Sequence, residues 1–163
     1  MFSQTDVSGD ISGNWTVENS PYIVVNNLVL QPADTLLIDP GVEVRFDGNY
    51  RVDIFGLFLA VGTESDSITF TRNGDINWMS LNFSDDSNDD SRLEYSIIEY
   101  ASESGYAPYN GAVNANLSSP TINNYTIRNC SHDGIYLQSS SSEVSGNTLQ
   151  DISGYGIYIS DNS

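Results

Sequence analysis

A repeat with a fixed offset of 22 residues runs from Val113 to Ile159. A period of this length is typical of stacked coils, in which each repeat packs only against its neighbours. Apolar residues within a repeat alternate at a spacing of two, which predicts short strands rather than helices. The corresponding positions are Val113, Ile135 and Ile157; Ala115, Leu137 and Ile159; Ile122 and Val144; Thr126 and Thr148; Ile127 and Leu149; Cys130 and Ile152.

Upstream of Val113 the repeat continues with irregular spacing. Apolar pairs recur at offsets of 21 and then 24 residues, which predicts further coils of similar length. The pairs matched in this way are Leu36 with Ile38, Leu57 with Leu59, and Leu81 with Phe83.

Two insertions interrupt the upstream repeats. Leu93 precedes its counterpart Ile122 by 29 residues, so this coil carries seven extra residues, which we place at 103–110. A second insertion, at 84–92, contains the acidic run at 85–90. Insertions in repeat proteins form surface loops and often lie on the binding face.

Several segments resemble the right-handed parallel β-helix proteins built of pectate-lyase-like repeats. The similarity lies in 35–46, in 62–71, in 78–83 and in the paired segments Gly134-Ile135-Tyr136 and Gly156-Ile157-Tyr158. It implies an all-β fold, a right-handed single-stranded parallel β-helix of about seven coils of ~22 residues. We assign 1–14 to an N-terminal arm or leader and 15–163 to the β-helix domain.

The charge balance restricts the partners. The chain has 22 acidic residues, five basic ones and a formal net charge of -17. Nucleic acid and anionic membranes present negative charge, so both are excluded as expected partners. The charge is consistent with a solvated acidic coat, or with a saline or calcium-rich setting in which cations screen or bridge it.

No membrane segment is expected, and a signal peptide is expected to be absent or to have been removed before this numbering begins. No stretch approaches the roughly 20 apolar residues that span a bilayer, and the first residues lack the basic and apolar regions of a signal peptide. The lone cysteine, Cys130, corresponds to Ile152 in the next repeat. It is therefore expected to be a small buried hydrophobe rather than a reactive thiol.

Catalytic residues are hard to find. Polysaccharide hydrolases of the resembled class use aspartates with a Gly-His-Gly and an Arg-x-Lys, whereas this chain has no Lys and its one histidine, His132, lies in a turn before a strand. Lyases of that class use a basic residue beside calcium. Arg128 is available, but Glu99 and Gln150 are its counterparts in neighbouring repeats, which favours a cross-strand ion pair. The sequence thus supports no catalytic set.

A calcium site is predicted in the acidic insertion. Asp86, Asn88 and Asp90 reproduce the first three ligand positions of a calcium loop, and oxygen donors suit calcium. The glycine and the bidentate glutamate that complete such a loop are replaced by Ser91 and Ile97. A solvated charge run explains the same residues.

Tyrosines offer a possible carbohydrate-binding surface. Tyr136 and Tyr158 correspond in the repeat and lie between inward aliphatic residues, so they should face outward one rung apart. Tyr106 and Tyr109 on the insertion at 103–110 add to the same surface. Such rings bind sugars, pack against a subunit or stiffen the sheet.

Five Asn-x-Ser/Thr sequons are glycosylation candidates or, alternatively, polar turn residues. Asn124 corresponds to Gly146, an exchange that a left-handed turn allows. The five are Asn14, Asn82, Asn116, Asn124 and Asn129.

The ends of the coil suggest a function. The last strand pattern stops three residues before the sequence does, and no amphipathic cap follows it. Either the chain is a fragment of a longer coil, or this open coil end is covered by another molecule. Stacking the start of one copy on the end of the next generates a filament. We therefore expect a non-catalytic extracellular or cell-surface structural protein that self-assembles as a homo-oligomer, filament or surface layer. The alternatives are a carbohydrate-binding module and a polysaccharide lyase or hydrolase.

Overall fold

The computed structural model describes residues 4–102 and 110–161, and strands with short connections make up nearly all of that part. A single short 3-10 helix is found there, at Val17–Asn19. The strands are β1 (Thr5–Asp10), β2 (Gly13–Trp15), β3 (Tyr22–Leu30), β4 (Thr35–Ile38), β5 (Glu43–Phe46), β6 (Val52–Ile54), β7 (Leu57–Val61), β8 (Ile68–Arg72), β9 (Leu81–Phe83), β10 (Arg92–Glu94), β11 (Ser96–Glu99), β12 (Gly111–Asn116), β13 (Thr121–Asn123), β14 (Thr126–Cys130), β15 (Asp133–Gln138), β16 (Val144–Ser145), β17 (Thr148–Ile152) and β18 (Ile157–Ser160).

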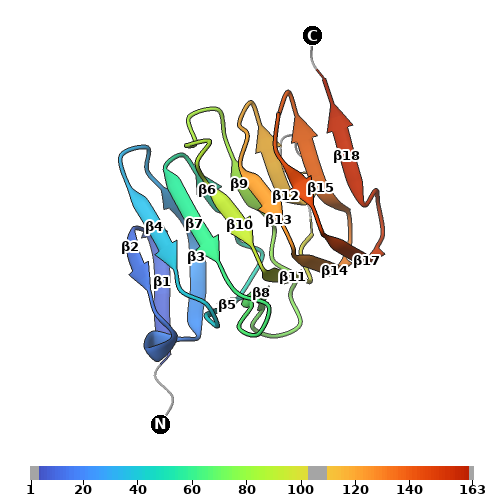
Figure 1. Ribbon diagram of the computed structural model, residues 1–163. Coiled ribbons are helices and arrows are strands. Elements are labelled where there is room, and N and C mark those ends of the chain that lie inside the picture. The colour runs from blue at the N-terminus through green and yellow to red at the C-terminus, as the bar shows by residue number, and fades with distance from the viewer. Residues whose placement is uncertain (1–3, 103–109, 162–163) are drawn as a thin grey trace.

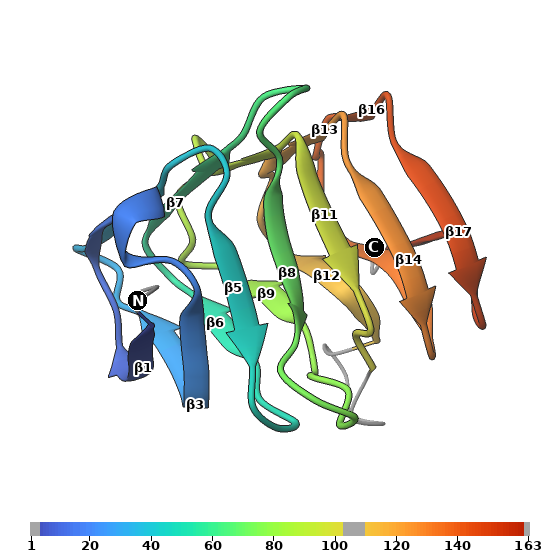
Figure 2. The ribbon, with the colours of Figure 1, turned by 90° about the horizontal axis from the view of Figure 1, so that it is seen from below.

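The strands form three parallel ladders, which we call the first, second and third faces (Figure 1). The first face runs β3-β5-β8-β11-β14-β17 and fills the front of Figure 2. The second runs β3-β6-β9-β12-β15-β18, and the third runs β2-β4-β7-β10-β13-β16. The long strand β3 joins two faces, because Tyr22 to Val24 pair with β5 whereas Leu28 to Leu30 pair with β6.

Successive coils stack in the register that the repeat predicts. Val113 pairs with Ile135, and Ile135 pairs with Ile157. On the third face Leu93 pairs with Ile122, which confirms the longer offset across the insertion placed at 103–110. Parallel strands of one ladder are separated by a whole turn of chain, so the 22-residue spacing is the length of one coil.

The core fills the space between the three faces. Alternate side chains point inward, and the central coils bury them completely; Phe46, Phe70 and Leu81 are at most 1% exposed. Aromatic rings stack between neighbouring coils, as Phe46 does on Trp78 with ring centroids 4.2 Å apart. Burial of these apolar side chains is the main force that holds the coils together.

Left-handed corners recur from coil to coil. Tyr95, Asn124 and Gly146 occupy the same corner and have φ angles of 46°, 54° and 66°. The expected exchange of asparagine for glycine at a left-handed turn is therefore confirmed for Asn124 and Gly146. These corners redirect the backbone between faces without interrupting the stack.

Residues 5–15 belong to the stack, although we assigned 1–14 to an arm or leader. Residues Thr5 to Asp10 form β1, which pairs along β3, and Gly13 to Trp15 pair with β4. Ile11 is 7% exposed and joins the core. Residues 5–10 contain a single apolar residue, Val7, which is why their sequence pattern is weak.

Two upstream matches were wrong. Leu36 and Ile38 pair with Phe58 and Ala60 rather than with Leu57 and Leu59. The segment 57–61 is apolar throughout, so alternation does not identify its inward side, and a slip of one residue exchanges the two faces of a strand. Leu81, which we matched to this ladder, instead pairs with Val52 on the second face.

Candidate functional site

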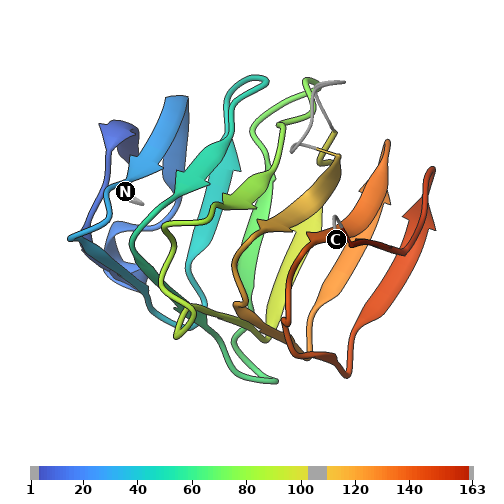
Figure 3. The same ribbon diagram turned by 90° about the horizontal axis from the view of Figure 1, so that it is seen from above.

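The C-terminal end of the stack exposes side chains that other coils bury. Ile135 and Leu137 of β15 are 0% and 4% exposed, whereas their partners in β18, Ile157 and Ile159, are 42% and 70% exposed. In the described residues β16, β17 and β18 each have a strand neighbour on one side only. This surface, which we call the C-terminal end, therefore presents inward-type isoleucines to solvent. Figure 3 shows the red C-terminal strands at one edge of the stack.

The N-terminal end is polar by contrast. Asp6, Ser8 and Asp10 of β1 are exposed. The apolar residues of this coil are covered, with Ile11 and Trp15 each 7% exposed and Trp15 stacked on the ring of Tyr22. The first coil thus resembles the polar capping repeat that closes many solenoids.

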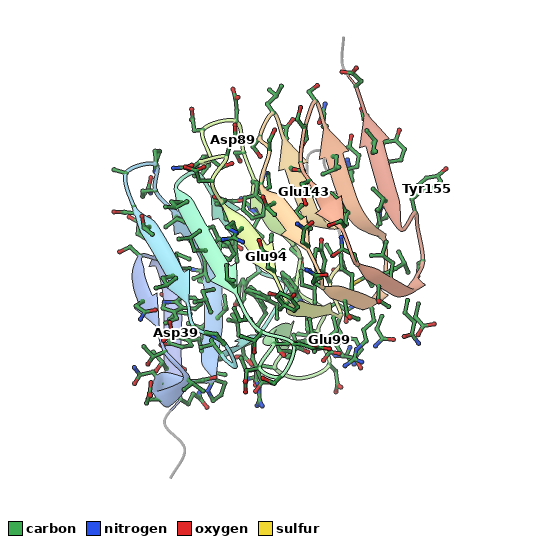
Figure 4. The ribbon with its side chains drawn as sticks, in the orientation of Figure 1. Asp39, Asp89, Glu94, Glu99, Glu143 and Tyr155 are labelled. Carbon is green, nitrogen blue, oxygen red and sulfur yellow. The ribbon has the colours of Figure 1, made fainter. Side chains whose placement is uncertain are left out.

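Positive charge is confined to the middle of the chain. All five arginines lie between Arg45 and Arg128, so the sequence on either side carries carboxylates without a compensating arginine or lysine. Four of the arginines form ion pairs with N–O distances of 2.7 to 2.8 Å, including the predicted pair of Arg128 with Glu99. The side chains at both ends therefore carry negative charge only. Figure 4 shows one of these carboxylates, Glu143, toward the C-terminal side.

Tyr136 and Tyr158 face outward and stack, with ring centroids 5.2 Å apart and ring planes 7° apart. Sequence reasoning missed a third tyrosine, Tyr155, whose ring centroid lies 5.5 Å from that of Tyr158. Tyr155 is 65% exposed and projects from the end of the stack (Figure 4). Its backbone N–H donates to the buried carboxylate of Asp133 at 2.7 Å, which fixes the corner before β18. In the sequence, only the recurring glycines around Tyr155 indicated such a corner.

Polar groups continue the same row toward the middle of the second face. Asp53, Asn82 and Asn114 lie in register with Tyr136 and Tyr158, and we call these five residues the outer row. The side-chain amide of Asn82 donates to Asp53 at 3.1 Å and its oxygen accepts from Asn114 at 2.8 Å. Asn82 and Asn114 are at most 2% exposed, so this part of the row is a satisfied polar network rather than an open site.

The sequons differ in accessibility. The amide of Asn82 is buried and hydrogen-bonded, which leaves no space for a glycan in the folded chain. Asn14, Asn124 and Asn129 are exposed, and Asn116 is half-buried. Glycosylation therefore stays a prediction for the accessible four.

The acidic insertion is tied to the preceding coil by the backbone N–H of Asn88, which donates to the carbonyl oxygen of Gly56 at 3.3 Å. Asp86, Asn88 and Asp90 are exposed, and the side-chain oxygen of Asn88 accepts from the backbone N–H of Asp90 at 2.8 Å. Asp89, rather than the predicted ligands, contacts the next coil by accepting from the N–H of Ser119 at 2.7 Å. In the part of the chain that the structure describes, no group of three acidic, histidine or cysteine side chains is placed to hold a metal. Calcium binding at Asp86, Asn88 and Asp90 stays a prediction.

Of the remaining candidate residues, His132 and Cys130 lie within the described part of the fold. His132 Nδ1 lies 2.6 Å from the carbonyl oxygen of Asn110 and 3.6 Å from the carboxylate of Asp133. Cys130 is buried as predicted, and burial raises the pKa of its thiol to about 11. Such a pKa leaves almost no thiolate near neutral pH. Tyr106 and Tyr109 lie outside the described residues.

The family comparison agrees with this architecture. No helix in the described residues is long and apolar enough to cross a membrane. No curated protein and no solved structure matches the chain significantly. The model of the right-handed β-helix region matches residues 12–163, nearly the whole chain. With its parallel ladders and 22-residue coils, the chain belongs to the right-handed parallel β-helix family.

Proposed function

We propose that this protein is a non-catalytic structural β-helix that self-associates through its C-terminal end. The observation that carries the proposal is the exposure of Ile157 and Ile159, 42% and 70%, at positions whose counterparts one coil earlier are buried. Fully burying an isoleucine side chain contributes about 1.5–3 kcal/mol. A second copy that covers this end gains such contributions and also pairs the free strand edges.

The proposed setting is extracellular or at the cell surface. Exposed sequons at Asn14, Asn124 and Asn129 are compatible with secretion and glycosylation. The net charge of -17 keeps separate copies soluble by mutual repulsion. Specific association must then come from a localised apolar surface, which the C-terminal end supplies.

The test of self-association is sedimentation of the purified chain over a wide concentration range. We expect a concentration-dependent oligomer, and Ile159→Asp should raise its dissociation constant at least about tenfold because it places a charge in the apolar contact. Ile76→Asp is the matched control, since Ile76 is 61% exposed in the connection between β8 and β9. A chain that is monomeric at every concentration, or a control that weakens association equally, contradicts the proposal.

Glycan binding is a second candidate function. It is favoured by the exposed rings of Tyr155 and Tyr158, 65% and 39% accessible, because aromatic faces stack on sugar rings. In calorimetric titrations with soluble polysaccharides, Tyr155→Ala should abolish binding, whereas Ile159→Asp should retain it. If neutral and acidic polysaccharides all give no heat with the wild-type chain, the glycan function fails.

A further inference from the structure

Two asparagines of the chain, Asn73 and Asn110, are followed directly by glycine. In such a pair the backbone nitrogen of the glycine can attack the side-chain amide carbon of the asparagine, because glycine has no side chain that obstructs the approach. The attack also requires a backbone that is free to turn and an N–H that is not engaged elsewhere. The two pairs share the same local sequence, so their surroundings decide which of them reacts.

The pair Asn110-Gly111 is restrained by a strand. Gly111 begins β12, is buried and pairs with Asp133 of the next coil. Its N–H donates to the side-chain oxygen of Asn114 at 2.8 Å. Attack on Asn110 would break this buried hydrogen bond and leave the oxygen of Asn114 without it, which is costly. The folded structure therefore protects Asn110.

The pair Asn73-Gly74 lies in the connection between β8 and β9, where these restraints are missing. The N–H of Asn73 makes a bond to the preceding coil, to the carbonyl oxygen of Phe46 at 2.7 Å. Among the described residues the N–H of Gly74 donates no hydrogen bond. Both residues are exposed, and a Cβ atom added at Gly74 would have no atom within 4 Å. The nitrogen of Gly74 is thus free, and the turn has room to rearrange.

The side chain of Asn73 links two successive coils. Its amide nitrogen donates to the carboxylate of Asp47 at 3.0 Å. Phe46 pairs with Arg72, so Asp47 and Asn73 follow the ends of neighbouring strands and occupy the same corner. A hydrogen bond to an ionised acceptor is stronger than one between neutral groups. Chemical change at Asn73 therefore alters a contact between β5 and β8.

We propose that Asn73 is a site of spontaneous deamidation and that its conversion breaks the contact with Asp47. The nitrogen of Gly74 loses its proton to solvent and bonds to Cγ of Asn73, while the bond from Cγ to Nδ2 breaks and Nδ2 leaves, protonated by water, as ammonia. Water then opens the resulting succinimide to aspartate or isoaspartate. The product places a second carboxylate beside Asp47, where like charges repel. This reaction does not depend on self-association or glycan binding.

Peptide mapping by mass spectrometry tests the site. Cleavage after arginine places the two asparagines in different peptides, 73–92 and 93–128, and fragmentation locates the converted residue. In folded chain incubated at mildly alkaline pH, Asn73 should convert at least about tenfold faster than Asn110. In urea-unfolded chain the two should convert at similar rates, because only their common sequence remains. Folded chain in which Asn73 reacts no faster than Asn110 overturns the proposal.

Two variants test the consequence for the fold. Asn73→Asp carries the product carboxylate and should unfold at a lower urea concentration than the wild type at low salt. Asp47→Asn combined with Asn73→Asp exchanges the amide and the carboxylate, so the hydrogen bond can form again and the wild-type midpoint should return. Equal midpoints for Asn73→Asp and the wild type would overturn the proposed loss of the contact between coils.

Discussion

The two ends of the described stack expose different kinds of side chain. At the N-terminal end polar side chains of β1 face solvent, and the apolar residues behind them, such as Ile11, are covered. At the C-terminal end Ile159 remains 70% exposed although its strand has the same alternation as the buried strands before it. A regular repeat therefore does not by itself provide an end, because each coil buries its apolar row only under a following coil.

The largest expected difference in the free energy of unfolding is between substitutions at the same position of successive coils. Leu137→Ala removes a side chain that is 4% exposed and should lower the free energy of unfolding by about 2–5 kcal/mol. Ile159→Ala, one coil later, should change the unfolding of the monomer by less than about 1 kcal/mol. Urea unfolding at low protein concentration compares the two. Equal losses would mean that the C-terminal end is as well buried as the coil before it.

The pH dependence of the free energy of unfolding reports on Cys130, which is buried near the C-terminal end. Burial raises the pKa of Cys130 from 9.0 to about 11, so above about pH 9 the unfolded chain loses the thiol proton while the folded chain keeps it. Stability is therefore fully present below pH 9 and is lost as the pH rises toward 11, by about 1 kcal/mol at roughly pH 10.

Cys130→Val should flatten this part of the pH profile in urea unfolding, because valine is apolar and does not titrate. Residual loss at higher pH is expected from Tyr125, since burial raises the pKa of its hydroxyl well above the ordinary value. Identical profiles for the variant and the wild type would mean that solvent reaches Cys130 through the C-terminal end.

A smaller loss of stability is expected from substitution of Arg128, the last arginine in the sequence. Arg128 lies 2.8 Å from Glu99 and is 45% exposed, so Arg128→Gln should lower the free energy of unfolding by about 0.2–1 kcal/mol. The loss should fade in high salt, and Arg128→Lys should recover part of it. A loss that is independent of salt would show that packing, and not charge, accounts for the effect.

Calcium should have the smallest effect on stability, measured as the melting temperature. If Asp86, Asn88 and Asp90 bind the ion weakly, calcium should raise the melting temperature by about 2 °C or less, through preferential binding to the folded state. Asp86→Asn combined with Asp90→Asn should remove the shift, and magnesium serves as the control ion. An equal shift with both ions, retained in the variant, would assign the effect to general screening of the acidic surface.

Sequence reasoning succeeded where the repeat was regular. The pairing of Val113 with Ile135, and of Ile135 with Ile157, was predicted correctly. The ion pair of Arg128 with Glu99 was also predicted correctly. It failed at Leu57 and Leu59, where apolar residues on both sides of the strand leave the register undetermined. Residues 5–10 were also missed, because they carry little alternation to detect.

The candidate site was only partly accessible from the sequence. Tyr136 and Tyr158 were placed correctly in one outward row, but nothing in the pattern indicated that Tyr155 joins them. Asn82 looked like a surface sequon, yet its amide lies in a hydrogen-bonded network with Asp53 and Asn114. Burial depends on neighbours that are distant in sequence, which a local motif does not record.

By itself the sequence determined the class of fold, the coil length and the sign of the charge, because periodicity and composition act along the chain. The tertiary structure decided which apolar residues lie inside and which remain exposed. Ile135 and Ile157 have equivalent places in the repeat, but among the described residues only Ile135 is paired with a strand on both sides. The hydrophobic effect depends on the surface removed from water, and that surface exists only once the coils are stacked.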